Sequence, residues 1–155
     1  MNAVRNGAWV ALRWVTALFF FGVIIEFFLV GYGLFDMKNS ATTPHSATVT
    51  IDNANSLDPH RFVGFLLSDV GALLILILVL LAWPPTKLLV RWIVLAVLAI
   101  VQGILATVGF DHWVIGMFHP VNALIVLGLS GHLAHYAWKN GRSAEKAPAG
   151  IVEPG

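Results

Sequence analysis

Apolar residues gather in four long runs along the chain, and short polar segments separate them. The runs cover residues 14–35, 60–83, 92–110 and 114–138. About 20 consecutive apolar residues in a helix span the roughly 30 Å hydrocarbon layer of a bilayer, so each run predicts one transmembrane helix. We therefore expect an all-α integral membrane protein: one domain, residues 1–138, folded as a bundle of four transmembrane helices in the lipid bilayer.

Two segments lack the apolar character of a membrane span. The first is a polar loop at residues 36–59, in which the stretch 48–53 predicts a short strand followed by a turn. The second is the C-terminal segment 139–155, whose Ala, Gly and Pro content predicts a disordered tail. Pro84 and Pro85 predict a tight turn between the second and third helices.

Lysine and arginine residues divide unevenly between the two ends of the predicted helices. Only Lys38 and Arg61 flank the end that carries the loop 36–59. The other end carries Arg5, Arg13, Lys87, Arg91, Lys139, Arg142 and Lys146. Because cytoplasmic flanks accumulate basic residues, we expect both termini to be cytoplasmic and the loop 36–59 to lie outside, in the inner cell membrane.

Composition excludes several classes of function. The chain of 155 residues is 58% hydrophobic and 11% charged, with a net charge of +1, which leaves no basic surface for nucleic acid. The absence of cysteine excludes a disulfide scaffold, an iron–sulfur cluster and a covalently attached c-type haem. Any metal chemistry must therefore use the six histidines and eight carboxylates.

Two histidines lie at matching depths in the predicted bundle. His60 and His119 are at the outer starts of the second and fourth helices, which run parallel and could face each other. Two neutral imidazoles projecting inward from facing helices are suited to axial ligation of a haem iron, so we predict that this pair binds one b-type haem. The alternative is that each histidine only caps its helix or forms a hydrogen bond at the membrane interface.

Neighbouring residues add to this candidate site. Gly64 follows His60 by one turn and Ala123 follows His119 by one turn, so each histidine has a small residue on its own face. Such residues would give a flat macrocycle clearance, although they are also common in ordinary helix packing. Arg61 could pair with a haem propionate, or it could extend its side chain to the membrane surface.

Three further polar residues lie deeper in the predicted spans. Glu26, Asp69 and Gln102 have no obvious charged partner at their own depth, and such positions are costly in a bilayer. Asp69 and Gln102 could share a proton or a hydrogen bond, and Glu26 could serve a proton, quinol or substrate path. Glu26 and Asp69 are therefore the candidate catalytic residues. Polar contacts that only hold helices together are the alternative, especially for Gln102.

The remaining histidines give weaker indications. His132 and His135 lie at the inner end of the fourth helix, where a cation complements the helix dipole. The inner half of the second helix offers them no histidine partner, so we expect one haem at most. A zinc or copper site outside the membrane could use Asp111, His112 and His45, without any typical ligand spacing.

Several of these residues together resemble one half of the heme A synthase family. The resemblance covers the second to fourth helices and rests on His60-Arg61, Gly64, Gln102-Gly103, Thr107, His119 and Ala123. That family consists of two four-helix halves, each with a histidine at the outer start of its second and fourth helices. The resemblance therefore implies that His60 and His119 are a haem pair.

The chain departs from the family pattern in three respects. Leu57 stands where the family carries a glutamate tied to catalysis, with Asp58 adjacent but out of register. The first helix lacks the family's Gly-rich, Thr-containing end, and the loop 36–59 lacks a cysteine pair. The chain also supplies one half only, so a homodimer would be needed to imitate the family. An enzymatic role in haem modification is left open.

The sequence thus favours a membrane protein that binds heme b and serves electron transfer or haem handling. We expect it to act beside a membrane protein partner or as a homo-oligomer, as a possible component of an oxidoreductase. One alternative is a cofactor-free structural subunit of a larger membrane complex, with Gly128, Gly131 and Ala134 at its contact surface. Another is a small transporter or proton pathway that uses Glu26 and Asp69.

Overall fold

The computed structural model describes residues 3–43, 46–47 and 54–145. Within these residues the chain forms four helices that are long and apolar enough to cross a membrane. They span Ala3–Asn39, Asn55–Ala82, Thr86–Asp111 and Trp113–Asn140. The predicted helical architecture with four membrane-length helices is confirmed, and each helix begins before the apolar run that predicted it.

The first helix, α1 (Ala3–Ala41), is the longest element of the molecule. It starts before and ends after the predicted run 14–35, because its polar ends contain no proline and continue the backbone hydrogen-bonding pattern. Two short antiparallel strands follow, β1 (Thr42–Thr43) and β2 (Ser46–Ala47). The strand predicted at residues 48–53 lies outside the described residues.

The second membrane-length helix consists of four consecutive segments. A 3-10 turn, η1 (Asn55–Leu57), leads into α3 (Asp58–Phe65), which has a proline in its first turn. A π-helical segment, η2 (Leu66–Gly71), connects α3 to α4 (Ala72–Ala82). The helix ends at Trp83, which adopts the left-handed conformation with φ 44° before the two prolines. The predicted turn is therefore present.

The second half of the chain contains α5 (Thr86–Asp111), the single turn α6 (Trp113–Gly116) and α7 (Phe118–Glu145). The connection from α5 to α6 is short, and backbone amides of α6 donate to the carbonyl oxygen of His112. Because α7 continues to Glu145, residues 139–145 of the predicted disordered tail are helical. Residues 146–155 lie outside the described part.

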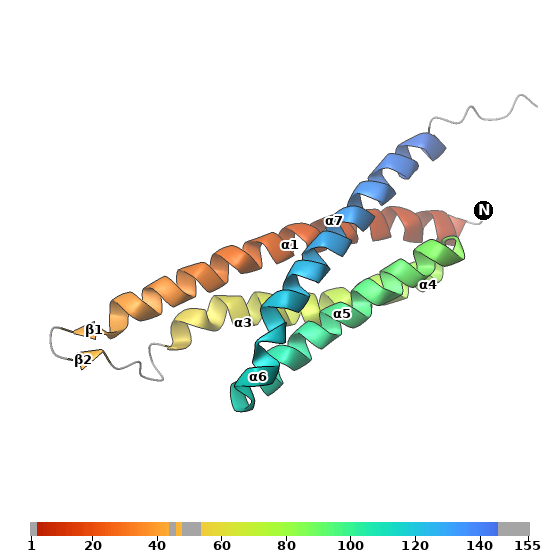
Figure 1. Ribbon diagram of the computed structural model, residues 1–155. Coiled ribbons are helices and arrows are strands. Elements are labelled where there is room, and N and C mark those ends of the chain that lie inside the picture. Colours follow the sequence, from red (N-terminus) through yellow and green to blue (C-terminus); the bar gives the residue numbers. More distant parts are fainter. Residues whose placement is uncertain (1–2, 44–45, 48–53, 146–155) are drawn as a thin grey trace, which may run out of the picture.

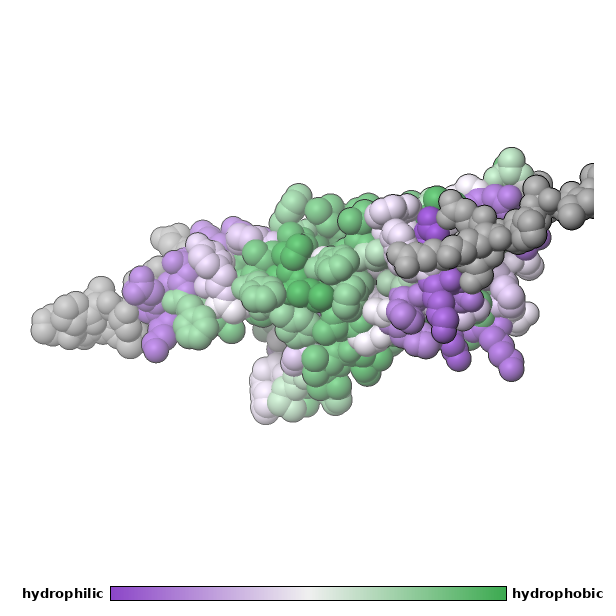
Figure 2. Space-filling model, turned by 90° about the horizontal axis from the view of Figure 1, so that it is seen from above, coloured by the Kyte–Doolittle hydropathy of each residue, from purple (hydrophilic) through white to green (hydrophobic). Residues whose placement is uncertain are grey.

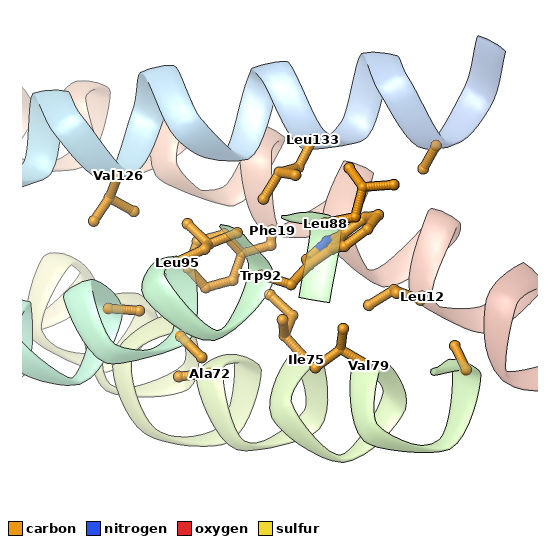
Figure 3. Close-up of a cluster of buried hydrophobic side chains, with 14 of the residues drawn as sticks. Leu12, Phe19, Ala72, Ile75, Val79, Leu88, Trp92, Leu95, Val126 and Leu133 are labelled. Carbon is orange, nitrogen blue, oxygen red and sulfur yellow. The ribbon is translucent and has the colours of Figure 1, made fainter. Parts of the chain in front are cut away.

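The four long helices pack most tightly near the turn at Trp83, which we call the turn end of the molecule. There, α1 and α5 each pack against both α4 and α7. Figure 3 shows side chains from all four helices converging on one apolar core. The largest side chains that are fully buried in it are Leu12 of α1, Ile75 and Val79 of α4, Trp92 and Leu95 of α5, and Leu133 of α7.

The opposite end, which carries β1, β2 and α6, is packed more openly, and we call it the loop end. No residue of α3 is buried. α3 packs against α1 and η2, whereas α7 packs against α1, α5 and α6. Figure 1 shows that the lower part of α7, with α6, diverges from α1. At this end a pocket lies between the helices that carry His60 and His119.

Hydrophobic side chains form a band across the molecule. On the face shown in Figure 2, apolar residues cover the middle and hydrophilic residues gather toward both ends. Many large apolar side chains on α1, α4 and α5 are exposed, among them Phe28, Leu73 and Val97. A surface of this kind matches the environment of a bilayer, in which apolar side chains face lipid and polar ones face water.

Candidate functional site

A pocket of about 980 Å³ lies between the diverging helices at the loop end. Its wall is mainly apolar and draws residues from α1, α3, η2, α5, α6 and α7. It includes each of the candidate site residues that the sequence indicated: Glu26, His60, Arg61, Gly64, Asp69, Gln102, His119 and Ala123. A large, mostly apolar pocket with a few converging polar groups is the usual form of a cofactor site.

The two histidines face one another across this pocket. The ring centroids of His60 and His119 are 6.3 Å apart, and the ring planes are nearly perpendicular, at 88°. A metal–imidazole bond is about 2.0 Å long and a ring nitrogen lies about 1.1 Å from its centroid, so two imidazoles that share one metal ion have centroids roughly 6 Å apart. The separation therefore suits two ligands of one ion.

His60 has a charged partner that the sequence did not indicate. Its Nδ1 contacts Oε2 of Glu26, and the Glu26 side chain is only 12% exposed. Glu26 was expected to lack a charged partner at its own depth, and the structure places it against the His60 imidazole, because α1 packs alongside α3. Gly64 faces the same carboxylate: a Cβ atom there would lie 3.7 Å from Oε2.

His119 is held by neutral groups. Its Nδ1 lies 3.2 Å from the backbone carbonyl oxygen of Gln102, and the Gln102 side-chain nitrogen lies 3.1 Å from Nδ1 and 3.2 Å from Nε2. A carbonyl accepts and an amide nitrogen donates, so a proton on Nδ1 satisfies the Gln102 carbonyl and leaves Nε2 to accept from the Gln102 amide. The approach of the amide nitrogen to Nδ1 is then not a hydrogen bond, and the two remaining bonds favour the Nδ1–H tautomer of His119.

Asn122 is a site residue that the sequence reasoning missed. Its side-chain nitrogen donates to the carbonyl oxygen of Leu98 at 2.9 Å and to Oε1 of Gln102 at 2.7 Å. These bonds turn the nitrogen of Gln102 toward His119. Asn122 is buried and lies three residues after His119, so the helical i, i+3 spacing of two polar residues could have indicated it.

Arg61 lies at the edge of the pocket. Its Nη1 is 2.7 Å from Oδ1 of Asp58, and its guanidinium carbon is 5.8 Å from the ring centroid of Phe110. The side chains of Arg61 and Asp58 are 41% and 61% exposed, so the ion pair is accessible to solvent. Arg61 thus lines the pocket and already pairs with Asp58, and its predicted role toward a haem propionate stays a prediction.

Asp69 lies on the π-helical segment η2. The hydrogen bond described for its carboxylate comes from Ser68, at 2.6 Å, and not from Gln102 as we predicted. α5 approaches η2 closely at Gly103, where a Cβ atom would lie 2.9 Å from Oγ of Ser68. π-helical turns often occur at functional sites, and this one places a carboxylate in the pocket wall.

The other histidines lie apart from the pocket. Nε2 of His132 is 3.3 Å from Nη1 of Arg91, toward the turn end. Within the described ranges, no group of three His, Cys, Asp or Glu side chains could hold a metal ion, so Asp111 and His112 form no such site there. His45 lies outside those ranges.

No protein-family model, no curated protein and no solved structure matches the chain. The resemblance to the heme A synthase family stays a prediction that rests on the residues quoted for it.

Proposed function

We propose that this chain is a membrane protein that binds one heme b between His60 and His119 and serves electron transfer or haem handling. The observation that carries the proposal is the pair of imidazoles 6.3 Å apart in the wall of a 980 Å³ pocket. The sequence indicated both histidines from depth alone, and the geometry of the pocket supports their pairing.

The residues of the pocket fit a haem in three ways. His119 carries its proton on Nδ1, which leaves the Nε2 lone pair for a metal once the Gln102 amide turns away. Gly64 and Ala123 line the wall beside the two histidines and leave room for a flat ring. Arg61 lies at the edge, where a propionate could meet water.

His60 and His119 would hold the haem between them, and the group would supply one-electron transfer because both ligands come from the protein. The chain's own contribution is to orient the two rings, exclude water with the apolar wall and hold the propionates at the solvent edge. Leu57 occupies the place of the family's catalytic glutamate, which favours electron transfer over haem modification. A membrane protein partner, or a second copy of the chain, would exchange electrons or haem with it.

The proposal includes a placement in the inner cell membrane. The four long helices would span the bilayer with both termini on the cytoplasmic side, since basic residues concentrate at the turn end. The pocket would then lie near the outer face, and the band of apolar side chains would contact lipid.

An oxidised-minus-reduced visible spectrum of the detergent-purified protein, produced with ample haem supply, tests the proposal. We expect a low-spin haem spectrum in the natural protein, loss of bound haem in His60→Ala and His119→Ala, and no change in His132→Ala, which alters a histidine near Arg91 instead. Absence of haem from the natural protein would overturn the proposal and favour a cofactor-free subunit.

A further inference from the structure

The two predicted haem ligands have different surroundings behind their rings. Nδ1 of His60 contacts the carboxylate of Glu26, whereas Nδ1 of His119 lies against the backbone carbonyl of Gln102. One imidazole therefore has a formal negative charge behind it and the other has a neutral dipole. The difference arises from the contact between Glu26 of α1 and His60 of α3, two residues that come together only in the folded chain.

The placement of Glu26 is difficult to explain by packing alone. Glu26 belongs to a membrane-length helix. Both oxygens of its carboxylate are buried, and neither has a conventional hydrogen bond within the described residues. His60 Nδ1 is the group in contact with it. A buried carboxylate in a membrane span carries a large desolvation cost, so a specific partner is expected, and here the partner is an imidazole nitrogen.

We infer that Glu26 is the positioning residue of His60: it accepts a hydrogen bond from Nδ1–H, directs Nε2 to the pocket, and increases the electron donation of this imidazole to a bound iron. The inference rests on the proposed function. Metal-bound histidines commonly donate their second ring nitrogen to a carboxylate or a carbonyl, which fixes the tautomer and raises the basicity of the ligand.

Two consequences follow for the iron. A negative charge behind His60 favours the oxidised, more highly charged metal, so it lowers the midpoint potential. It also makes His60 the stronger ligand of the two. Gly64 lies beside this carboxylate, and a Cβ atom at that position would be in ordinary van der Waals contact with Oε2, at 3.7 Å.

The first test compares midpoint potentials of haem-loaded protein by redox titration. Glu26→Gln keeps the shape and removes the charge, and we expect its equilibrium with a fixed mediator to shift at least tenfold toward the reduced form, which is about 59 mV for a one-electron couple. Asp36→Asn is the matched control, because Asp36 is on the same helix, accepts from Ser56 and does not line the pocket. We expect its potential to be unchanged.

A second test starts from His60→Gly, so it remains informative even if the single variant Glu26→Gln does not fold. In His60→Gly, free imidazole should restore the six-coordinate spectrum at a concentration at least tenfold lower than 1-methylimidazole, which has no N–H to donate. The double variant H60G/E26Q should lose that preference.

The outcomes separate the two proposals. If the natural protein binds no haem, the proposed function fails. If it binds haem but Glu26→Gln leaves the potential unchanged, or imidazole and 1-methylimidazole act equally in His60→Gly, the role of Glu26 is overturned while the haem site stands.

Discussion

The imidazole rings of His60 and His119 approach to 6.3 Å between centroids, although α3 otherwise packs against η2 whereas α7 packs against α5 and α6. The contact is possible because α3 and α7 both pass the pocket while each is held by α1. The histidines therefore meet across a space and not across a helix–helix contact. The position of His119 depends on the polar groups of α5 and α7 that surround it.

Asn122→Leu should weaken haem binding while both histidines remain. Haem binding requires the Gln102 amide to leave Nε2 of His119, so the bond that matters here is the one from Asn122 to the Leu98 carbonyl, which fixes α7 against α5 beside His119. An unsatisfied buried polar group costs about 1–3 kcal/mol. We expect haem to transfer to an acceptor such as apomyoglobin about tenfold faster. Asn140→Leu is the control, because it removes a comparable side-chain bond, to Tyr136, at the far end of the same helix. Equal transfer rates in the two variants would contradict the role of Asn122.

Gly33→Ala should destabilise the fold, and Gly31→Ala should not. A Cβ atom at position 33 would lie 2.8 Å from the backbone oxygen of Ser56 and 2.6 Å from Leu57, whereas a Cβ at position 31 meets nothing within 4 Å. Overpacking of this kind costs about 1–3 kcal/mol, and alanine gains up to about 1 kcal/mol in helix propensity. SDS titration in mixed micelles measures the free energy of unfolding of both variants. Similar values for the two would show that η1 does not pack against α1 at Gly33.

Trp92→Ala should be the most damaging single change at the turn end. Trp92 is fully buried, and its indole nitrogen donates to the hydroxyl of Thr16 at 3.2 Å. Loss of a large buried aromatic side chain costs about 3–5 kcal/mol. Trp113→Ala is the comparison, since Trp113 is 73% exposed and surface changes stay within about 0.5 kcal/mol. The same SDS titration should separate the two variants clearly.

The absence of natural cysteine makes the proposed orientation directly testable, because each introduced thiol is the only one in the chain. Asn55→Cys places a thiol at the loop end and Thr86→Cys places one at the turn end. In intact cells, a membrane-impermeant maleimide should label position 55, and it should label position 86 only after the membrane is opened. The reverse pattern would place the pocket on the cytoplasmic side.

The sequence predicted the four long helices well because the length of an apolar run is a direct consequence of bilayer thickness. It did not predict the residues at which the helices begin and end. α1 continues to Ala41 through polar residues, because helical hydrogen bonding does not need apolar side chains once the helix has formed. The π-helical segment at Leu66–Gly71 was also missed, since it depends on local backbone geometry and has no periodic signature.

The candidate site was predictable in its depth but not in its contacts. The depth of His60 and His119 follows from counting residues along each helix, and both line one pocket. The contact between Glu26 and His60 depends on how α1 is rotated toward α3, which the sequence pattern does not determine. A hydrogen bond between Asp69 and Gln102 was expected from their similar depth alone. In the structure, the carboxylate of Asp69 accepts a hydrogen bond from Ser68, its immediate neighbour.

The division between a closely packed turn end and an open loop end has a consequence for biogenesis. The apolar core around Trp92 and Leu133 is formed by the chain itself, so the bundle does not need a cofactor to close. Under the proposed function, haem loading would then be a separate late step, limited by supply and not by folding. Under haem starvation, such a protein is expected to accumulate as a stable receptor instead of being degraded.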